Sequence, residues 1–206
     1  MGYHLSRLER ALHQKGFRLL AGVDEAGRGP LAGPVVAAAC LIPQSVYLKG
    51  IKDSKALNAE VRRKLFWKII SQTIMGVGVV GEQEIDRMNI LNASLLAMRK
   101  AVLALSVTPD FLLVDGPFGI DLPLPQMPVV QGDAKLISIG AASIVAKVTR
   151  DEMMETYDRE YPHYGFKYHK GYPTPAHIAA LEEHGPSPIH RLSFRPVARL
   201  ASLPQS

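Results

Sequence analysis

Residues 19–42 read LLAGVDEAGRGPLAGPVVAAACLI, and this stretch decides the fold class. Two apolar runs, over residues 19–24 and 35–42, have the composition of strands, and a glycine-rich turn over residues 27–30 separates them. Two consecutive strands, followed by alternating helical and strand patterns further along the chain, indicate an α/β protein with a mixed sheet.

Two adjacent carboxylates, Asp24 and Glu25, stand where the first strand is expected to end. Neighbouring side chains point to opposite faces within a strand, but a turn at its end lets both converge on one point in front of the sheet. Like charges at such a point raise each other's pKa, so the pair is costly to hold without a counter-charge. A divalent cation is the usual remedy, and oxygen ligands favour magnesium or manganese.

The turn after the two acids contains Gly27, Arg28 and Gly29, which we call the GRG turn. Glycine lets the backbone approach a ligand closely, and successive N–H groups of such a turn form an anion-binding concavity. The guanidinium of Arg28 adds a planar fork that suits phosphate. Metal ligands beside a phosphate-binding turn indicate phosphodiester chemistry.

The spacing of apolar residues divides the rest of the chain into helices and short strands. We expect helices over residues 3–15, 58–72, 90–105, 138–160 and 175–183, with a short one after residue 196, and strands over residues 73–80, 111–115 and 127–130. Asn58 and Asn89 are candidate N-caps for two of these helices. No element is assigned to the aromatic and basic stretch 163–175.

The composition bounds the class of protein. The 206 residues suit one domain with a small C-terminal appendage, and a net charge of +5 fits a nucleic-acid partner, although many basic proteins bind none. The single cysteine, Cys40, excludes a disulfide framework and a cysteine-cluster zinc site, and its apolar strand predicts a buried, inert thiol. No apolar run approaches the roughly 18 residues that span a membrane, and no secretion signal opens the sequence, so we expect a cytoplasmic protein without a membrane partner.

Several motifs resemble one known family. The segment GVDEAGRGPLAGPVV closely resembles the signature of bacterial ribonuclease HII, and LLVDGP, QGDAK, AASIVAKVTRD, KGYPTPAH and HRLSFRPV follow in the family's order. The resemblance covers residues 19–197. It implies a ribonuclease H-like fold: a mixed central sheet flanked by helices over residues 19–160, an N-terminal helical segment over residues 1–18, and a small helical, substrate-binding extension over residues 161–206.

The resemblance also assigns the acids. Asp24, Glu25, Asp115 and Asp133 match the family's four catalytic, metal-binding acids, which hold Mg²⁺ or Mn²⁺ for two-metal hydrolysis. Taken alone, Asp115 could belong to an ordinary turn and Asp133 to a loop or a helix cap. Their positions support the assignment, because Asp115 ends an expected strand and sites in α/β sheets gather at the carboxyl ends of strands.

The implied activity is cleavage of the RNA strand of RNA–DNA hybrids and incision 5′ of single ribonucleotides in duplex DNA, which leaves 5′-phosphate and 3′-hydroxyl ends. That activity requires sensing the 2′-hydroxyl. The family match gives this role to the GRG turn, and it gives Tyr172 the role of stacking on the deoxyribose that follows the ribonucleotide. Three further residues match a family segment near the phosphates: Lys52, Ser54 and Lys55. The alternatives are a merely tight turn, a half-buried tyrosine and a solvated charged loop.

Other readings of the chain stay open at this point. Residues Lys147, Arg150 and Asp151 form either a structural pair or a phosphate-facing edge. The histidines lack compact zinc spacings and are expected at the surface or in a basic groove: His163, His169, His177 and His184. The competing functions are another nuclease or nucleotidyl transferase of the same fold and a noncatalytic nucleic-acid-binding module. We expect a monomer, because no apolar heptad seam is present.

Overall fold

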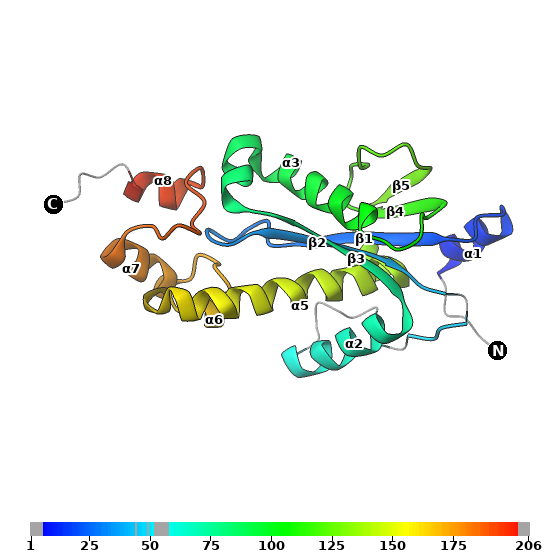
Figure 1. Cartoon of the computed structure of the whole chain (residues 1–206), viewed down its shortest axis with the longest axis horizontal. Coiled ribbons are helices and arrows are strands. Elements are labelled where there is room, and N and C mark those ends of the chain that lie inside the picture. The colour runs from blue at the N-terminus through cyan, green and yellow to red at the C-terminus, as the bar shows by residue number, and fades with distance from the viewer. Residues whose placement is uncertain (1–5, 44, 49, 52–57, 202–206) are drawn as a thin grey trace.

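The computed structural model describes residues 6–43, 45–48, 50–51 and 58–201. A five-stranded sheet in the order β3-β2-β1-β4-β5 forms its centre (Figure 1). The strands are β1 (Leu20–Ala26), β2 (Val35–Leu41), β3 (Ile74–Val80), β4 (Phe111–Asp115) and β5 (Gln126–Val129). Strand β2 runs antiparallel to β1 and β3, whereas β4 runs parallel to β1 and β5. The predicted mixed sheet is therefore confirmed.

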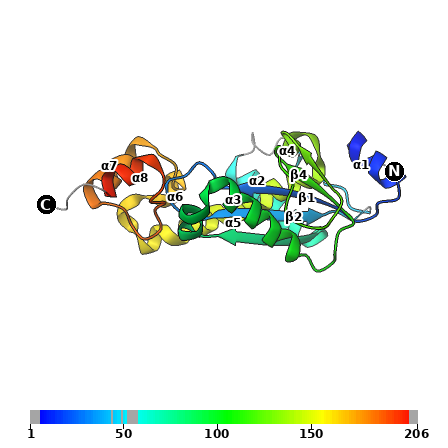
Figure 2. The same cartoon turned by 90° about the horizontal axis from the view of Figure 1, so that it is seen from above.

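Helices cover both faces of the sheet. Helix α3 (Glu82–Leu103) packs on one face, and α5 (Ile137–Glu160) packs on the other with α2 (Ala59–Gln72) beside it (Figure 1). The shorter helices are α1 (Arg7–Gln14), α4 (Gly132–Lys135), η2 (Pro162–Tyr164), α6 (Phe166–His169), α7 (Pro175–His184) and α8 (Arg195–Ala201). Helices α6, α7 and α8 gather at the end of the molecule opposite α1 (Figure 2). No helix among the described residues is long and apolar enough to cross a membrane.

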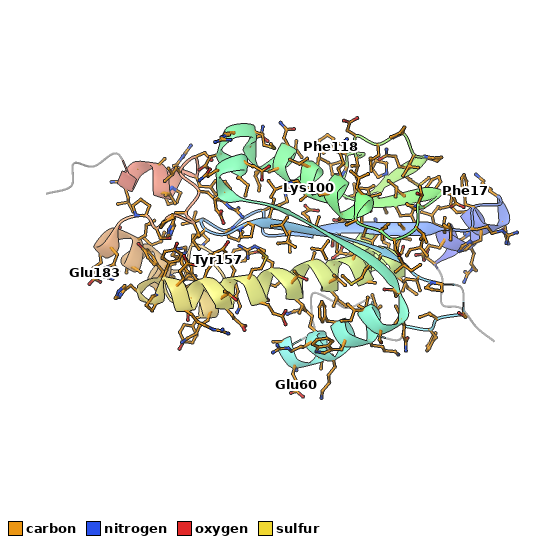
Figure 3. All side chains as sticks on the ribbon, in the orientation of Figure 1. Phe17, Glu60, Lys100, Phe118, Tyr157 and Glu183 are labelled. Atoms are coloured by element: carbon orange, nitrogen blue, oxygen red, sulfur yellow. The ribbon has the colours of Figure 1, made fainter. Side chains whose placement is uncertain are left out.

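The small side chains of β2 let both helical layers approach the sheet. Ala37 and Ala39 belong to the core beneath α3, whereas Ala38 and Cys40 belong to the core beneath α5, as the two-residue period of a strand requires. Burial raises the pKa of the Cys40 thiol to about 12, which confirms the predicted inert thiol. Figure 3 shows the side chains that fill these layers, with Glu60 of α2 and Lys100 of α3 on opposite sides of the sheet.

Most predicted elements are present with small shifts at their ends, but the first strand is longer than expected. It does not end at Asp24, because Glu25 pairs with Ala37 and Ala26 with Val36. The partner strand β2 begins at Val35 and still offers backbone groups at these positions, so the ladder continues past both acids. The expectation that the acids stand at a strand end was wrong.

Helix α3 starts at Glu82, eight residues before the predicted start at residue 90. Asn89 interrupts it with φ 70° and ψ 164°, and its side-chain oxygen accepts hydrogen bonds from the amides of Leu91 and Asn92 at 3.0 and 3.1 Å. Asn89 therefore caps the second half of α3, as predicted. The first half was missed, as were α4 and α6.

Candidate active site

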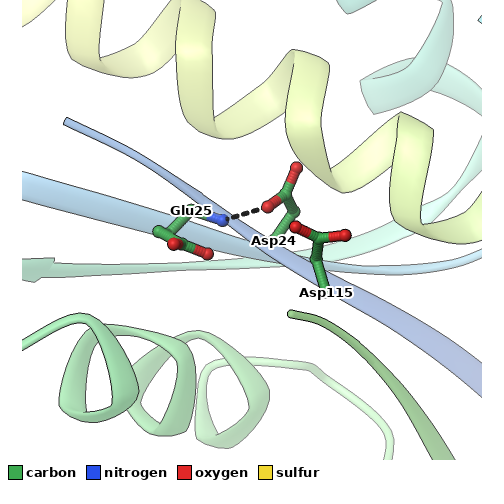
Figure 4. Close-up of side chains that lie close together, drawn as sticks. All are labelled: Asp24, Glu25 and Asp115. Atoms are coloured by element: carbon green, nitrogen blue, oxygen red, sulfur yellow. Dashed lines mark hydrogen bonds between the residues drawn. The ribbon is translucent and has the colours of Figure 1, made fainter. Parts of the chain in front are cut away.

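Two acids from neighbouring strands lie side by side because of the sheet register. The parallel pairing of β1 and β4 places Val23 opposite Val114, so the next residues, Asp24 and Asp115, end up adjacent (Figure 4). One carboxylate oxygen from each of Asp24, Glu25 and Asp115 lies within 4.8 Å of the others. We call these three residues the acidic group. The structure therefore brings together three of the four predicted acids.

Burial makes the acidic group electrostatically unfavourable by itself. Asp24 is 5% exposed, and this burial, with the charges of Glu25 and Asp115, holds its pKa well above the usual range. The amide of Glu25 opposes the shift by donating a 2.7 Å hydrogen bond to Oδ1 of Asp24, which Figure 4 shows as a dashed line. Burial also raises the pKa of Glu25, against the attraction of Arg28, whose Nη1 lies 3.2 Å from Oε1 of Glu25.

These residues fit a divalent cation. Oε2 of Glu25 is buried and accepts no hydrogen bond from the described part of the chain. A buried carboxylate oxygen without a donor is unfavourable unless a cation or a ligand meets it. An all-oxygen donor set of this kind suits magnesium or manganese.

The fourth acid, Asp133, lies on the element that adjoins the acidic group, but it is not one of the three residues of that group. It sits in α4, is 1% exposed, and follows Gly132, whose amide donates a 2.6 Å hydrogen bond to Oδ1 of Asp115. Asp133 is therefore on the adjoining element. The oxygens that approach one another within 4.8 Å come from the other three acids.

A cleft of about 380 Å³ opens beside Glu25. The GRG turn and Tyr172, which are far apart in the sequence, both line it. They lie close together, since a β-carbon placed on Gly29 would lie 3.4 Å from Cε1 of Tyr172. The Tyr172 side chain is 42% exposed, so its ring is accessible from the cleft. Lys52, Ser54 and Lys55 lie outside the described residues.

Three further polar residues line the cleft: Arg62, Ser143 and Lys147. Only Lys147 was considered from the sequence, as part of a structural pair or a phosphate-facing edge, and none of the three was predicted in the site. Lys147 forms a 2.6 Å ion pair with Asp151, so the structural pair considered for these two residues is present. Lys147 also lines the cleft, as the alternative of a phosphate-facing edge expected. The side chain of Ser143 opposes the rise in the pKa of Asp24. A signal existed for Lys147 and Ser143, because both lie within the AASIVAKVTRD motif, but Arg62 carries no such signal.

The buried polar residues of the C-terminal region were not predicted. Arg150 is 1% exposed and bonds backbone carbonyls, so neither of the two alternatives for it was right. His177 is fully buried, and its Nε2 lies 3.0 Å from Nε2 of His190, so the surface expectation was wrong for His177. It holds for His163 and His184, which are exposed, while His169 is half-buried.

A ribonuclease H-like sheet with an acidic group beside a basic cleft defines a metal-dependent nuclease. The family model described as Ribonuclease HII matches residues 21–197. The ribonuclease HII of Syntrophotalea carbinolica is 52% identical over 190 residues, which cover 92% of this chain and 91% of that protein. The ribonuclease HII of Geobacter metallireducens is 55% identical over 190 residues, which cover 92% and 89%. The chain belongs to the ribonuclease HII family.

A solved structure agrees with this assignment. The crystal structure of ribonuclease H2 from Pyrococcus horikoshii OT3 matches with a TM-score of 0.76 and 32% identity over 88% of this chain and 96% of that one. The ribonuclease H-like fold and the resemblance to ribonuclease HII are thus confirmed. The family membership assigns this chain the activity of a type 2 ribonuclease H, a metal-dependent endonuclease. This sets aside the noncatalytic binding module and the other nucleases of this fold.

Proposed function

We propose that Asp24, Glu25, Asp115 and Asp133 hold two divalent cations, Mg²⁺ or Mn²⁺. We also propose that this site cuts 5′ of ribonucleotides, both in RNA–DNA hybrids and in duplex DNA that carries a single ribonucleotide. The observation that carries the proposal is the acidic group, which is partly buried and includes one buried Glu25 oxygen that accepts no hydrogen bond from the described residues. Bound cations supply a water of lowered pKa and offset the charge that builds on the phosphate.

The chain's own groups orient the carboxylates before a ligand arrives. The amide of Glu25 holds Oδ1 of Asp24 at 2.7 Å, and the amide of Gly132 holds Oδ1 of Asp115 at 2.6 Å. Both donors are backbone groups of regular elements, so they cannot rotate away as a side chain would. Fixed donors of this kind reduce the reorganisation that ligand binding and reaction require.

We assign the selection of the ribonucleotide to the two walls of the cleft. Backbone N–H groups of the GRG turn are suited to the 2′-hydroxyl and the adjoining phosphates, since that hydroxyl is what distinguishes RNA from DNA. The ring of Tyr172, which lies beside Gly29, is suited to stack on the sugar that follows. This arrangement tests the shape and the hydroxyl at the junction and reads no base sequence.

Cations around the cleft support binding of the phosphate backbone. Arg28, Arg62 and Lys147 come from the GRG turn, α2 and α5, respectively, and all line the cleft. Such contacts give affinity without sequence preference and weaken with salt. Lys52, Ser54 and Lys55 are assigned to the same role from the sequence alone. The monomeric state, the cytoplasmic location and the boundaries 1–18, 19–160 and 161–206 also stay predictions.

A cleavage assay tests the proposal. The substrates are duplex DNA with one embedded ribonucleotide, a long RNA–DNA hybrid and an all-DNA duplex, each with Mg²⁺, Mn²⁺ or EDTA. We expect metal-dependent incision 5′ of the ribonucleotide, with 5′-phosphate and 3′-hydroxyl ends and no cutting of all-DNA duplex. If only the long hybrid is cut, Tyr172 does not recognise the junction. If cutting persists in EDTA, the reaction does not need the proposed cations.

A further inference from the structure

The side chain of Arg191, in the HRLSFRPV motif, is enclosed by the loop that contains the GRG turn. It is 0% exposed and forms five hydrogen bonds to backbone carbonyls. Its Nε and Nη2 reach Gly33 at 2.9 and 2.7 Å, and Nη2 also reaches Gly27 at 2.6 Å. Its Nη1 reaches Arg28 at 3.1 Å and Pro30 at 2.8 Å. All five N–H donors of one guanidinium are thus used within seven residues of the chain.

A buried guanidinium needs a reason, because removing its charge from water is unfavourable. Burial lowers the pKa of Arg191 to about 9, with the nearby charge of Arg150 acting in the same direction. No carboxylate of the described residues forms an ion pair with Arg191, so its charge is met by carbonyl oxygens and by the ring of Phe194, whose centroid lies 5.0 Å from Cζ. A rigid fork with five donors matches this set of acceptors, and an ammonium group does not.

A second buried arginine joins the same loop to the segment that carries Tyr172. Arg150 donates from Nε to the carbonyl of Pro34 at 2.9 Å and from Nη2 to that of Ala32 at 3.0 Å. Its Nη1 donates to the carbonyl of Lys170 at 3.0 Å. The GRG turn and the Tyr172 segment are therefore connected through the interior as well as across the cleft.

The residue before Arg191 reaches the other wall of the cleft. Nδ1 of His190 accepts a 2.9 Å hydrogen bond from the amide of Ser187, which assigns the ring proton to Nε2. That Nε2 then donates a hydrogen bond to Nε2 of His177 at 3.0 Å. Nδ1 of His177 in turn donates to the carbonyl of Tyr172 at 2.9 Å. The consecutive residues His190 and Arg191 thus hold both walls, one through a histidine relay and the other directly.

Peptide geometry relates these bonds to substrate contact. In a planar trans peptide the N–H points opposite to the C=O. Because the carbonyls of Gly27 and Arg28 point inward at Arg191, the N–H groups of Arg28 and Gly29, on the same two peptide planes, point away from it. Arg191 therefore sets the direction of the amides that the GRG turn offers.

We infer that Arg191 is a positioning residue for ribonucleotide recognition, which holds the GRG turn in its substrate-binding conformation from within the protein. The inference rests on the proposed function of that turn. It makes the C-terminal extension part of the specificity apparatus twice, through Tyr172 on the surface and through Arg191 in the interior. Among the described residues no hydrogen bond or ion pair joins Arg191 to the acidic group, so we expect Arg191 to control substrate affinity.

The test is the kinetics of Arg191→Lys on duplex DNA with one ribonucleotide. Lysine keeps the charge, but a single ammonium cannot serve four carbonyls. We expect KM to rise at least tenfold while kcat changes less than threefold, because the carboxylates stay in place. Amide exchange should also quicken over residues 27–33 and stay unchanged in β1.

Two matched variants separate positioning from general support. Arg195→Lys changes an exposed arginine of the same segment and should leave KM unchanged. Leu12→Ala removes buried packing in α1, away from the GRG turn, and none of these hydrogen bonds, and it should lower the melting temperature with less than a twofold change in KM. An unchanged KM in folded Arg191→Lys overturns the inference, and so does an equal rise in KM for Leu12→Ala at an equal loss of stability.

A second variant decides the matter if Arg191→Lys does not fold. The carboxylate of Asp86, at the surface of α3, accepts the amides of Leu192 and Ser193 at 2.8 and 2.9 Å, so Asp86→Ala loosens the residues that follow Arg191. A rise in KM of threefold or more supports the inference, and an unchanged KM overturns it. Arg28→Gln tests the turn itself. If Arg28→Gln raises KM but the Arg191 or Asp86 variant does not, the inference about Arg191 fails and the proposed role of the turn stands. If Arg28→Gln leaves KM unchanged as well, the proposed role of the turn fails.

Discussion

The amide of Gly132 donates a 2.6 Å hydrogen bond to Oδ1 of Asp115. This contact joins the first residue of α4 to the last residue of β4 and orients one carboxylate of the acidic group. It also fixes where the chain enters α4, and with it the position of Asp133. Helix α4, which the sequence patterns did not predict, is thus held in place by Asp115, which they predicted as a site residue.

The Gly132→Ala variant tests this contact. A β-carbon there would lie 2.5 Å from Cδ1 of Ile139 and 3.2 Å from Oδ1 of Asp115, so the Ile139 side chain, the Asp115 carboxylate or the start of α4 has to shift. We expect turnover to fall about tenfold and the metal concentration for half-maximal activity to rise, since both depend on ligand placement. Gly81→Ala, where a β-carbon meets nothing within 4 Å, is the control. Equal activity of both variants would argue against the contact.

Asp24→Asn removes one charge of the acidic group. We expect turnover to fall at least about a hundredfold, because a displaced cation no longer stabilises the transition state. The pKa of Asp24 is raised, so its ionised form is disfavoured in the folded protein, and the variant should melt at or above the wild-type temperature in EDTA. Thermal melts with and without Mn²⁺ check this, and the metal-induced rise should shrink.

The control for Asp24→Asn is Asp121→Asn, which changes an exposed acid outside the site. It should keep both the turnover and the stabilisation by metal. Wild-type activity in folded Asp24→Asn protein would falsify the assignment of the site.

Tyr172→Ala tests the sensing of the junction. Without the ring beside Gly29, we expect incision at a single ribonucleotide to fall about tenfold or more, the scale of a lost stacking contact. Cleavage of a long hybrid, which offers many registers, should fall less than about threefold. Tyr168→Ala removes an 80% exposed ring of α6 and should alter neither rate. Equal losses of Tyr172→Ala on both substrates would contradict the role.

Arg62→Gln tests the phosphate contacts of the cleft. We expect a higher KM on every cleaved substrate and a salt dependence that is weaker by about one charge. The neighbouring Arg63 does not line the cleft and forms a 3.2 Å ion pair with Glu152 on the surface, so Arg63→Gln is a matched control. The measurement is log KM against log salt concentration, and parallel lines for the two variants would remove Arg62 from the substrate path.

The relay of His177 and His190 predicts a pH dependence of stability. Burial lowers the pKa of both to about 4, whereas an unfolded histidine titrates near 6.5. Between these values the unfolded chain binds protons that the folded chain does not, so the free energy of unfolding falls as the pH falls from about 6.5 to about 4. Above about 6.5 this contribution to stability is fully present.

Urea unfolding at several pH values measures this slope. His190→Gln should reduce it by about one proton, and His163→Gln, which changes an exposed histidine, should leave it unchanged. The raised pKa values of Asp24 and Glu25 act in the opposite direction but equally in all three proteins, so the comparison cancels them. Identical slopes for the two variants would refute the prediction.

Most strands and helices and the positions of the acids could be predicted from the sequence, and the errors have physical causes. Strand periodicity located β1 and β4, and the rule that sites gather at carboxyl ends of strands placed Asp115 beside Asp24. The end of β1 was misjudged because the pairing strand, not local composition, decides where a ladder stops. The first half of α3 was missed because, of its residues 82–88, Ile85 alone is buried, which leaves too little periodicity to recognise.

The buried cations are a different kind of failure. Arg150 and Arg191 bond to carbonyl oxygens, which every residue possesses, so their partners leave no mark in the sequence. An arginine in an irregular segment predicts a solvated side chain. The motif that contains Arg191 was noticed through its family resemblance, but the reason for its presence is visible only in three dimensions.

Arg191 binds carbonyls that lie 158 to 164 residues earlier in the chain. A ribosome delivers the N-terminal strands first, and contacts of such long sequence separation form late. The carbonyls of Gly27 and Gly33 therefore have no guanidinium to bind until residue 191 has been made. If Arg191 sets the conformation of the GRG turn, that conformation is reached only after a residue far from the turn has joined the folded chain.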